Sequence, residues 1–242
     1  MARLSGINTH IPSTSQIDLV SNLRCEWIRI DIDWDMIEKR EGSFNFSSID
    51  KAVQYAKSKQ LKIFGTIAYT PSWMNADRRS HPNLDKWRIF VQKVASRYSN
   101  RIDALGIWNE PNLKEFYKGS IDDYKNLLEI GWTVIKSVNP RMIVIAGELS
   151  TMSGSNWYKY LKLLKTNPNI YDVCSIHSYK NSWDALKSAF NVGAFFGIAG
   201  WFFDKSLTKF IWLFSPYSFV FRPVSPSQIC FPFFLKSFKI LL

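Results

Sequence analysis

The segment Trp108-Asn109-Glu110-Pro111-Asn112 combines residue types suited to acid–base chemistry on a polar substrate. It ends an apolar, strand-like run at 104–108, and Pro111 forces the chain to turn directly after Glu110. A carboxyl group at the end of a buried strand is partly removed from water, which helps an acid to hold its proton near neutral pH. We therefore predict that Glu110 is a general acid/base and that Asn109 binds a substrate hydroxyl.

The elements that must position this segment alternate between strands and helices. Apolar, strand-like runs lie at 4–8, 27–32, 61–68, 104–108, 142–146 and 172–177, and amphipathic stretches lie at 49–56, 86–98, 124–138 and 157–164. Ser47 and Ser48 are candidate caps for the first of these helices. Strands that alternate with helices predict βαβ units and a parallel sheet.

The spacing of the strands favours a barrel. Six strands begin between residues 4 and 172, so the five intervals average about 34 residues, and eight such units need roughly 270 residues. A doubly wound open sheet is the alternative, but it normally carries a nucleotide-binding loop after an early strand. The predicted fold is an α/β, TIM (β/α)8-type barrel that is incomplete, with about six units.

Side-chain alternation predicts a polar lumen at the carboxyl ends of the strands, where such barrels carry their chemistry. Arg29 alternates with isoleucines on the second strand. On the fifth strand we expect Ala146 and Glu148 to face the lumen, opposite the neighbouring isoleucines. On the sixth strand His177 and Tyr179 share one face.

With these features the first 180 residues resemble glycoside hydrolase clan A, the (β/α)8 retaining glycosidases, most closely family 39 or the related family 5 cellulase-type domains. The resemblance rests on five segments in family order: 27–31 (WIRID), 41–46 (EGSFNF) with Ile49-Asp50, 69–73 (YTPSW), 108–112 (WNEPN) and 175–179 (SIHSY). It implies that Glu110 is the acid/base and that Asn109 binds the sugar 2-hydroxyl. It also implies that Arg29 supports the nucleophile and that His177 and Tyr179 line the cleft.

Tryptophans supply the remaining expected sugar contacts. Trp34, Trp73 and Trp108 offer flat apolar faces for the C–H side of a sugar ring, with core packing as the alternative for each of them. Trp73 belongs to one of the family-like segments, and we include it among the substrate-binding residues.

The chain departs from the family at the second carboxylate. Retention needs two carboxyl groups about 5 Å apart, and the family nucleophile is a Glu at the end of the seventh strand. This sequence has no Glu after Glu148, and Asp204 lacks the family setting. Glu148 is either a second carboxylate or a polar residue of the cleft, so the nucleophile is unknown. The predicted function is a retaining glycoside hydrolase; the alternative is a truncated pseudoenzyme that binds carbohydrate without turnover.

The composition changes after residue 189, which predicts a barrel domain at 1–189 and a hydrophobic tail at 190–242. Thirteen of the 18 phenylalanines lie in the tail, which has one acid, Asp204. Its apolar stretches are shorter than the roughly 20 residues of a membrane span, and a frameshift or disrupted gene would explain its composition. If the tail leaves the barrel open, the first and sixth strands have exposed edges and we expect poor solubility.

The resemblance implies an oligosaccharide or glycoside as the partner, and the composition indicates no other. The net charge of +11 is scattered among acids, which indicates a basic solvated surface and no nucleic-acid partner; membrane association is not expected. The three cysteines and three histidines have no metal-type spacing, so we expect no metal and no cofactor. The first residues lack the apolar core of a secretory signal, which predicts a cytoplasmic protein if this start is native. The oligomeric state is open.

Overall fold

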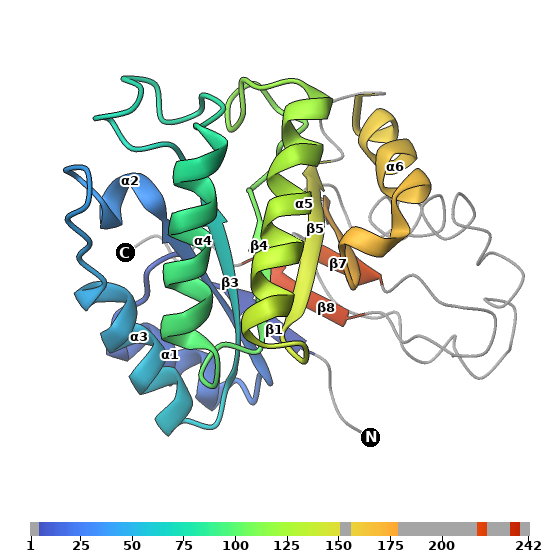
Figure 1. Cartoon of the computed structure of the whole chain (residues 1–242). Helices are drawn as coiled ribbons and strands as arrows, with labels where there is room; N and C mark the ends of the chain where they lie inside the picture. Colours follow the sequence, from blue (N-terminus) through green and yellow to red (C-terminus); the bar gives the residue numbers. More distant parts are fainter. Residues whose placement is uncertain (1–4, 151–155, 179–216, 222–232, 238–242) are drawn as a thin grey trace, which may run out of the picture.

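The computed structural model describes residues 5–150, 156–178, 217–221 and 233–237 (Figure 1). Six parallel strands form an incomplete α/β barrel of the TIM type, as the sequence predicts, and each begins within one residue of its expected start. They are β1 (Ser5–Asn8), β2 (Trp27–Asp33), β3 (Lys62–Ala68), β4 (Ala104–Ile107), β5 (Ile143–Ser150) and β6 (Val173–Ser178), paired in chain order.

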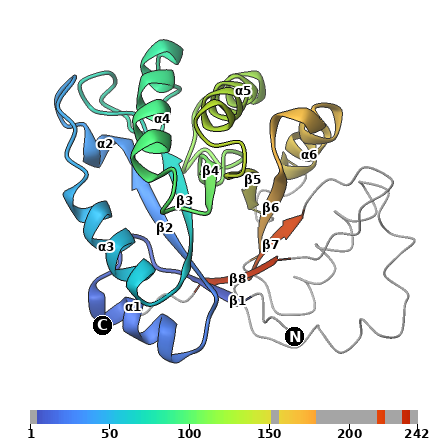
Figure 2. The ribbon, with the colours of Figure 1, turned by 60° about the horizontal axis from the view of Figure 1, so that its bottom comes forward.

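Helices cover the outside of these strands (Figure 2). They are α1 (Thr14–Asn22), α2 (Trp34–Ile37), α3 (Ser47–Ser58), α4 (Leu84–Tyr98), α5 (Ile121–Val138) and α6 (Asn156–Thr166), followed by the 3-10 turn η1 (Pro168–Ile170). Ser13 and Ser120 cap α1 and α5 in reciprocal capping boxes, and Asn83 caps α4. Side-chain caps therefore set where three of these helices begin.

The predicted caps of α3 are wrong. The helix starts at Ser47, so Ser47 and Ser48 lie inside its first turn and Phe46 occupies the cap position. Phe46 is buried against Tyr98, and Asn45 Oδ1 accepts the Ser47 N–H at 3.0 Å. Burial of the aromatic ring thus fixes the start of the helix, while a neighbouring amide satisfies an N–H group that a serine cap would otherwise serve.

Two strands from beyond residue 189 close the ring between β6 and β1. β7 (Tyr217–Phe221) runs antiparallel to β6, and β8 (Phe233–Ser237) runs antiparallel to β7 and parallel to β1. The open edges expected for a barrel that the tail leaves unfilled therefore do not occur, because hydrogen-bonded strands cover the first and sixth strands (Figure 2). The rest of the predicted tail lies outside the described residues, so its division from the barrel domain at residue 189 stays a prediction.

The barrel lumen is apolar at its base. Trp27, Phe64, Ala104, Ile145 and Val173, one from each of five neighbouring strands, form a buried cluster separate from the main core. The main core lies between the strands and the helices. On β2 and β6 the lumen residues have the parity that the sequence predicts.

The fifth strand differs from its prediction. Ile145 faces the lumen and Ala146 belongs to the outer core, which is the reverse of the expected parity. The register with β6 shifts between Ala146 and Leu149, where Gly147 and Glu148 both have positive φ, 89° and 44°. This β-bulge adds one residue and reverses the alternation, so Glu148 still points inward. The inward direction of Glu148 was therefore predicted correctly, although the predicted parity of Ile145 and Ala146 was wrong.

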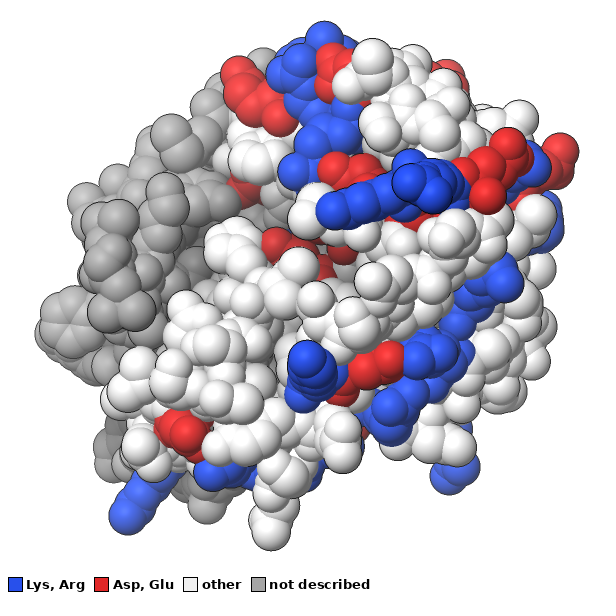
Figure 3. All heavy atoms as spheres, turned by 90° about the vertical axis from the view of Figure 1, so that its left-hand side faces the viewer, with Lys and Arg blue, Asp and Glu red and all other residues white. Residues whose placement is uncertain are grey.

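Charged side chains are interspersed on the outer surface. On the face shown in Figure 3, lysines and arginines lie beside acids. The ion pairs of the described residues include Arg97–Asp50 and Lys86–Glu41. Because of this mixing the face is not uniformly positive, although the whole chain has a net charge of +11. Within the described part of the chain, no helix has both the length and the apolar character that crossing a membrane requires.

Candidate active site

Glu110 lies directly after β4 and is 1% exposed. Its φ of 45°, together with the φ of 66° at Trp108, places two non-glycine residues of this segment in the left-handed region. Such conformations cost free energy and persist where surrounding contacts hold them. Trp108 Nε1 donates to Phe116 O at 3.0 Å, and Tyr160 Oη donates to Pro111 O at 2.8 Å, so the turn is held on both sides of Glu110.

Asn112 connects this turn to the neighbouring strand. Its Nδ2 donates to Ser150 O at 2.8 Å, and its Oδ1 accepts the Ser150 N–H at 3.0 Å. The side-chain amide thus pairs with the end of β5 as a strand backbone would. The carboxyl ends of β4 and β5, which carry Glu110 and Glu148, are fixed relative to each other.

Arg29 is the centre of the polar lumen and is 2% exposed. Its guanidinium forms an ion pair with Glu148 Oε2 at 2.7 Å and donates to Thr66 Oγ1 and Asn109 Oδ1, each at 2.8 Å. It also lies 3.4 Å from Asp31 Oδ1. Since Arg29 holds the oxygen of the Asn109 amide, the Nδ2 group of Asn109 is oriented to donate to a hydroxyl.

Glu148 is a fully buried carboxylate with several partners. Besides the ion pair with Arg29, its two oxygens lie 3.0 and 3.2 Å from the Thr66 hydroxyl. A Cβ atom at Gly106 would come within 2.2 Å of Glu148 Oε1, so β4 leaves space for this carboxylate by carrying glycine there. Tyr124 Oη accepts the Gly147 N–H at 2.8 Å and supports the bulge from α5.

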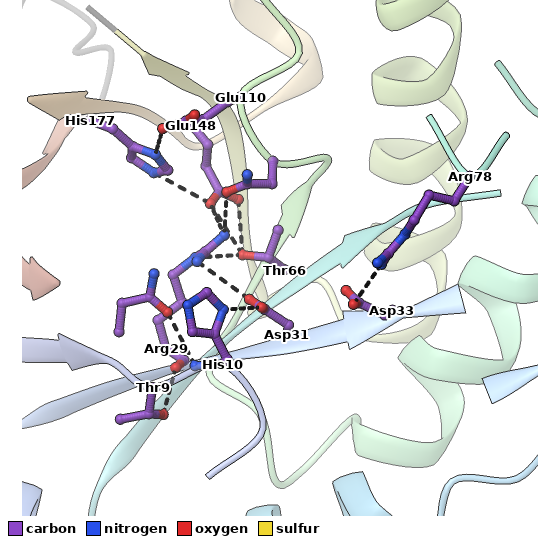
Figure 4. A network of polar contacts seen from close by, with 12 residues as sticks. Thr9, His10, Arg29, Asp31, Asp33, Thr66, Arg78, Glu110, Glu148 and His177 are labelled. Atoms are coloured by element: carbon purple, nitrogen blue, oxygen red, sulfur yellow. Dashed lines mark hydrogen bonds and ion pairs between the residues drawn. The ribbon is translucent and has the colours of Figure 1, made fainter. Parts of the chain in front are cut away.

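His177, at the end of β6, lies between the two glutamates (Figure 4). Its Nδ1 is 2.8 Å from Glu110 Oε1, and its Nε2 is 3.6 Å from Glu148 Oε2. Burial opposes protonation of the ring, but the hydrogen bonds and charges of the two glutamates outweigh it and raise the pKa of His177. We call Arg29, Glu110, Glu148 and His177 the inner cluster.

A second group of charges lies nearer the surface, at the end of β2. Arg78 contacts Asp33 at 2.8 Å and Asp35 at 3.1 Å, and its guanidinium stacks over the Tyr69 ring. Burial and the nearby Asp31 raise the pKa of Asp33 to about 6, against the effect of Arg78. We call Asp33, Asp35 and Arg78 the outer cluster.

Asp31 lies between the two clusters. His10 Nδ1 is 2.6 Å from Asp31 Oδ2, on the side opposite Arg29. Burial would raise the pKa of Asp31, but Arg29 and the hydrogen bond from His10 together hold it below the usual value. Asp31 therefore continues the network of polar contacts from the inner cluster toward the protein surface.

The structure brings most of the predicted site residues together and excludes two expected sugar platforms. Glu110, Asn109, Arg29 and His177 are joined by direct contacts or through Glu148, and Tyr179 lies outside the described residues. Trp73 is half-buried near the outer end of the site, and its Nε1 donates to Glu38 O at 2.8 Å. Its role in binding stays a prediction.

Trp34 and Trp108 cannot serve as sugar platforms. Both side chains are completely buried, and both pack against Trp87 of α4. Trp34 has the outward parity of the isoleucines that precede it, and the left-handed turn at Trp108 directs its ring among other aromatic side chains. Core packing, the alternative considered from the sequence, applies to both.

Sequence reasoning missed Thr66 and Asn112 and left the role of Glu148 open. Thr66 pairs with Asp31 across β2 and β3 and is the polar residue in the middle of an otherwise apolar strand, which was an available signal. Asn112 was quoted as part of the segment around Glu110 but was given no role. Among the described residues, no group of three or more His, Cys, Asp or Glu side chains could hold a metal ion.

The geometry can support proton transfer at the mouth of the barrel. Glu110 and Glu148 project from neighbouring strands and contact the same imidazole, while Arg29 balances the charge of Glu148. Such a site can donate or accept a proton at Glu110 and can bind a hydroxyl at Asn109. These are two of the functions that hydrolysis of a glycosidic bond requires.

Comparisons with known proteins concern the family and the fold of this chain. A family model described as Cellulase (glycosyl hydrolase family 5) matches residues 2–211. A β-xylosidase from Caldicellulosiruptor saccharolyticus is 24% identical over 156 residues, which cover 57% of this chain and 31% of that protein. The chain therefore spans about a third of the length of this curated relative.

Solved structures share the fold. A family 39 β-xylosidase from Caulobacter crescentus matches with a TM-score of 0.63 and 20% identity, covering 78% of this chain and 49% of that one. A glucosidase from Croceicoccus marinus matches with a TM-score of 0.64 and 16% identity, covering 80% and 49%. At these identities the similarity establishes the barrel fold alone.

Proposed function

This chain belongs to the cellulase family, glycosyl hydrolase family 5, and from that premise we propose that it cleaves O-glycosidic bonds with Glu110 as the general acid/base. The observation that carries the proposal is the setting of Glu110. It is buried at the end of a barrel strand, held in a left-handed conformation and hydrogen-bonded to His177. A general acid needs such a fixed, water-poor position beside the bond that it protonates.

In the proposed reaction Glu110 acts twice. It first donates a proton to the glycosidic oxygen as the bond to the sugar breaks, and it then takes a proton from the water that completes hydrolysis. Asn109, oriented by Arg29, donates its amide hydrogen to the sugar 2-hydroxyl. A retaining course also requires a carboxylate nucleophile, which we leave unassigned.

We propose β-xylosides as the first substrate class to examine. Two proteins that this chain resembles are β-xylosidases, from Caldicellulosiruptor saccharolyticus and Geobacillus stearothermophilus. A xyloside lacks the hydroxymethyl group of a glucoside, so parallel assays with the two sugars measure whether the site tolerates that group.

The test compares the full chain with Glu110→Gln on aryl β-xylosides and β-glucosides. We expect the variant to lose about 10²- to 10⁴-fold in kcat/KM, and to lose less with an aryl leaving group that needs little protonation. Glu115→Gln is the matched control, because Glu115 is an exposed residue in the same loop. Equal turnover by wild type and Glu110→Gln would refute the assignment.

A second candidate function is carbohydrate binding without turnover. It is favoured by the direction of β7, whose carboxyl end at Phe221 pairs with Cys174, at the start of β6 and away from Glu110. The family nucleophile follows the seventh strand at the opposite end of the barrel, and this sequence has no Glu after Glu148. Calorimetric binding of xylo-oligosaccharides by a wild-type chain that fails to hydrolyse aryl xylosides would favour this function.

A further inference from the structure

We propose that Glu148 is a positioning residue for the general acid, acting through His177. By attracting the Nε2–H of His177, it leaves Nδ1 as the ring nitrogen that exchanges a proton with Glu110. The inference rests on the proposed role of Glu110, and it assigns a task to a carboxylate that the family reaction does not require at this strand.

The backbone is built to bring Glu148 to this position. A regular strand with Ile145 in the lumen would turn residue 148 toward the helices, but the bulge at Gly147–Glu148 reverses the alternation. The bulge places Glu148 in the left-handed region, which is unfavourable for a residue with a side chain. Gly106 on the neighbouring strand leaves room for the carboxylate. These separate features of β4 and β5 all serve the inward placement of one side chain.

The partners of Glu148 fix its orientation. Arg29 contacts Oε2 at 2.7 Å, and Thr66 lies within 3.2 Å of both oxygens. The positive charge of Arg29 therefore lies against the same carboxyl oxygen that faces His177. The same Oε2 atom lies 3.6 Å from His177 Nε2, so negative charge faces that ring nitrogen.

This arrangement determines which nitrogen of His177 carries hydrogen. A neutral imidazole has one N–H and one acceptor nitrogen, and the partner of each nitrogen decides the tautomer. In the acid form of Glu110 that the proposed function requires, the Glu110 O–H donates to Nδ1, and the negative charge of Glu148 favours hydrogen on Nε2 of the neutral ring. Nδ1 then gains or loses the proton, and it lies 2.8 Å from Glu110 Oε1. Proton exchange by His177 is thereby confined to its contact with the general acid.

Other charged groups around His177 do not supply this function. Arg29 faces Glu148, and the Tyr124 hydroxyl of α5 is already bonded to the Gly147 N–H. Cys174 lies on the outer face of β6, where burial raises the pKa of its thiol to about 12. β7, which pairs with β6, contributes one titratable residue by sequence, Tyr217. Among the described residues, Glu110 and Glu148 are therefore the acids that contact the ring.

The experiment is ¹⁵N NMR of histidine-labelled full-length protein. The chain has three histidines, so His10→Gln and His81→Gln assign the spectrum by elimination. We expect neutral His177 in the wild type to carry its hydrogen on Nε2. In Glu148→Gln we expect the ratio of Nε2–H to Nδ1–H tautomers to fall by about tenfold or more, because the negative charge 3.6 Å from Nε2 is removed. The apparent pKa of the ring should also fall.

Glu38→Gln is the matched control, because Glu38 is another buried glutamate, bonded to Trp34 Nε1 and the Gly42 N–H. It should leave the His177 signals unchanged. A wild-type His177 with its hydrogen on Nδ1 would overturn the proposal even if Glu148→Gln failed to fold. So would an unchanged tautomer and titration in a folded Glu148→Gln.

These measurements do not depend on turnover, so they separate the two proposals. The expected tautomer in a chain that hydrolyses no glycoside would uphold the role of Glu148 in orienting His177 and reject the proposed activity. If the chain is active, Glu148→Gln should shift the pH profile of kcat/KM, whereas Glu38→Gln should not. An unshifted profile would overturn the role of Glu148 even if Glu110 proved essential.

Discussion

The inner and outer clusters lie at the same end of the barrel, and each contains two carboxyl groups and one arginine; the inner cluster also contains His177. They differ in burial. The side chain of Arg29 is 3% exposed and that of Glu148 is fully buried, whereas the side chain of Arg78 is 44% exposed. They also differ in how completely their buried polar atoms are hydrogen-bonded, since Asp33 Oδ1 is buried and has no hydrogen-bond partner among the described residues.

This difference indicates what each cluster contributes. In the inner cluster low dielectric makes every missing partner costly, so the groups form a fixed geometry suited to catalysis. In the outer cluster water screens the ion pairs, and burial together with the nearby Asp31 makes ionisation of Asp33 unfavourable. The inner cluster therefore depends on its partners for stability, and the outer cluster makes stability depend on pH.

The largest expected difference between the clusters comes from removing each arginine. Arg29→Met leaves Glu148 and Asp31 as buried charges without their main partner, and we expect a loss of about 3–5 kcal/mol of unfolding free energy. Arg78→Met removes exposed pairs and should cost no more than about 1 kcal/mol. Urea denaturation at pH 7 measures both. Losses of equal size would show that burial does not distinguish the clusters.

A smaller effect is expected from Gly106→Ala, which perturbs the inner cluster without removing a charge. The new methyl group would meet Glu148 Oε1 at 2.2 Å and the Phe64 ring at 2.8 Å, so we expect a loss of about 1–3 kcal/mol. Gly42→Ala is the comparison, because Gly42 has a φ of 78° but nothing within 4 Å. It reports backbone strain alone.

The role of Glu148 in this effect is measured by a double-mutant cycle. Adding Glu148→Ala to Gly106→Ala removes the carboxylate that the methyl group would strike, so the two losses should not be additive. Phe64 still obstructs the methyl group, and the relief should be partial. Additive losses would mean that Gly106 does not make room for Glu148.

The fold was predictable from the sequence as far as β6, because hydrophobic alternation and strand spacing are local signals. The predicted starts of all six strands are correct to one residue. The reversal at Gly147–Glu148 was not predictable, because a bulge depends on the neighbouring strand and on Tyr124 of α5. The closure of the ring by β7 and β8 was not predicted either, because it pairs strands that lie far apart in the chain, such as β8 with β1.

The site was predictable where a residue lies on a strand or just beyond its end. Arg29 and His177 lie on strands, Glu110 follows β4, and the three meet in one network. Trp34 continues the outward parity of the isoleucines of β2, a signal for core packing that the sequence carries, whereas the left-handed turn that directs the ring of Trp108 is not visible in the sequence. The outer cluster was not predicted, since Arg78 reaches Asp33 from a loop 45 residues later in the chain.

The smallest effect we predict is a pH dependence of stability that comes from Asp33 in the outer cluster. The pKa of Asp33 is raised to about 6 in the folded protein, from an ordinary 3.8, so folding favours its protonated form. The stability that Asp33 contributes is complete below pH 4 and is lost as the pH rises through 6. Asp33→Asn cannot ionise, and at pH 7 it should be more stable than the wild type by about 1–2 kcal/mol, after allowing for the lost contact with Arg78.

At pH 4 that advantage should disappear, because the wild-type Asp33 is then largely protonated as well. Chemical denaturation at pH 4, 5, 6 and 7 gives the difference between the two proteins at each pH. Glu115→Gln, which removes one exposed negative charge, should keep a nearly constant difference from the wild type over this range. If Asp33→Asn instead destabilises the protein at pH 7, the ion pair with Arg78 outweighs the cost of burying the Asp33 charge. The outer cluster would then depend on its arginine much as the inner cluster does.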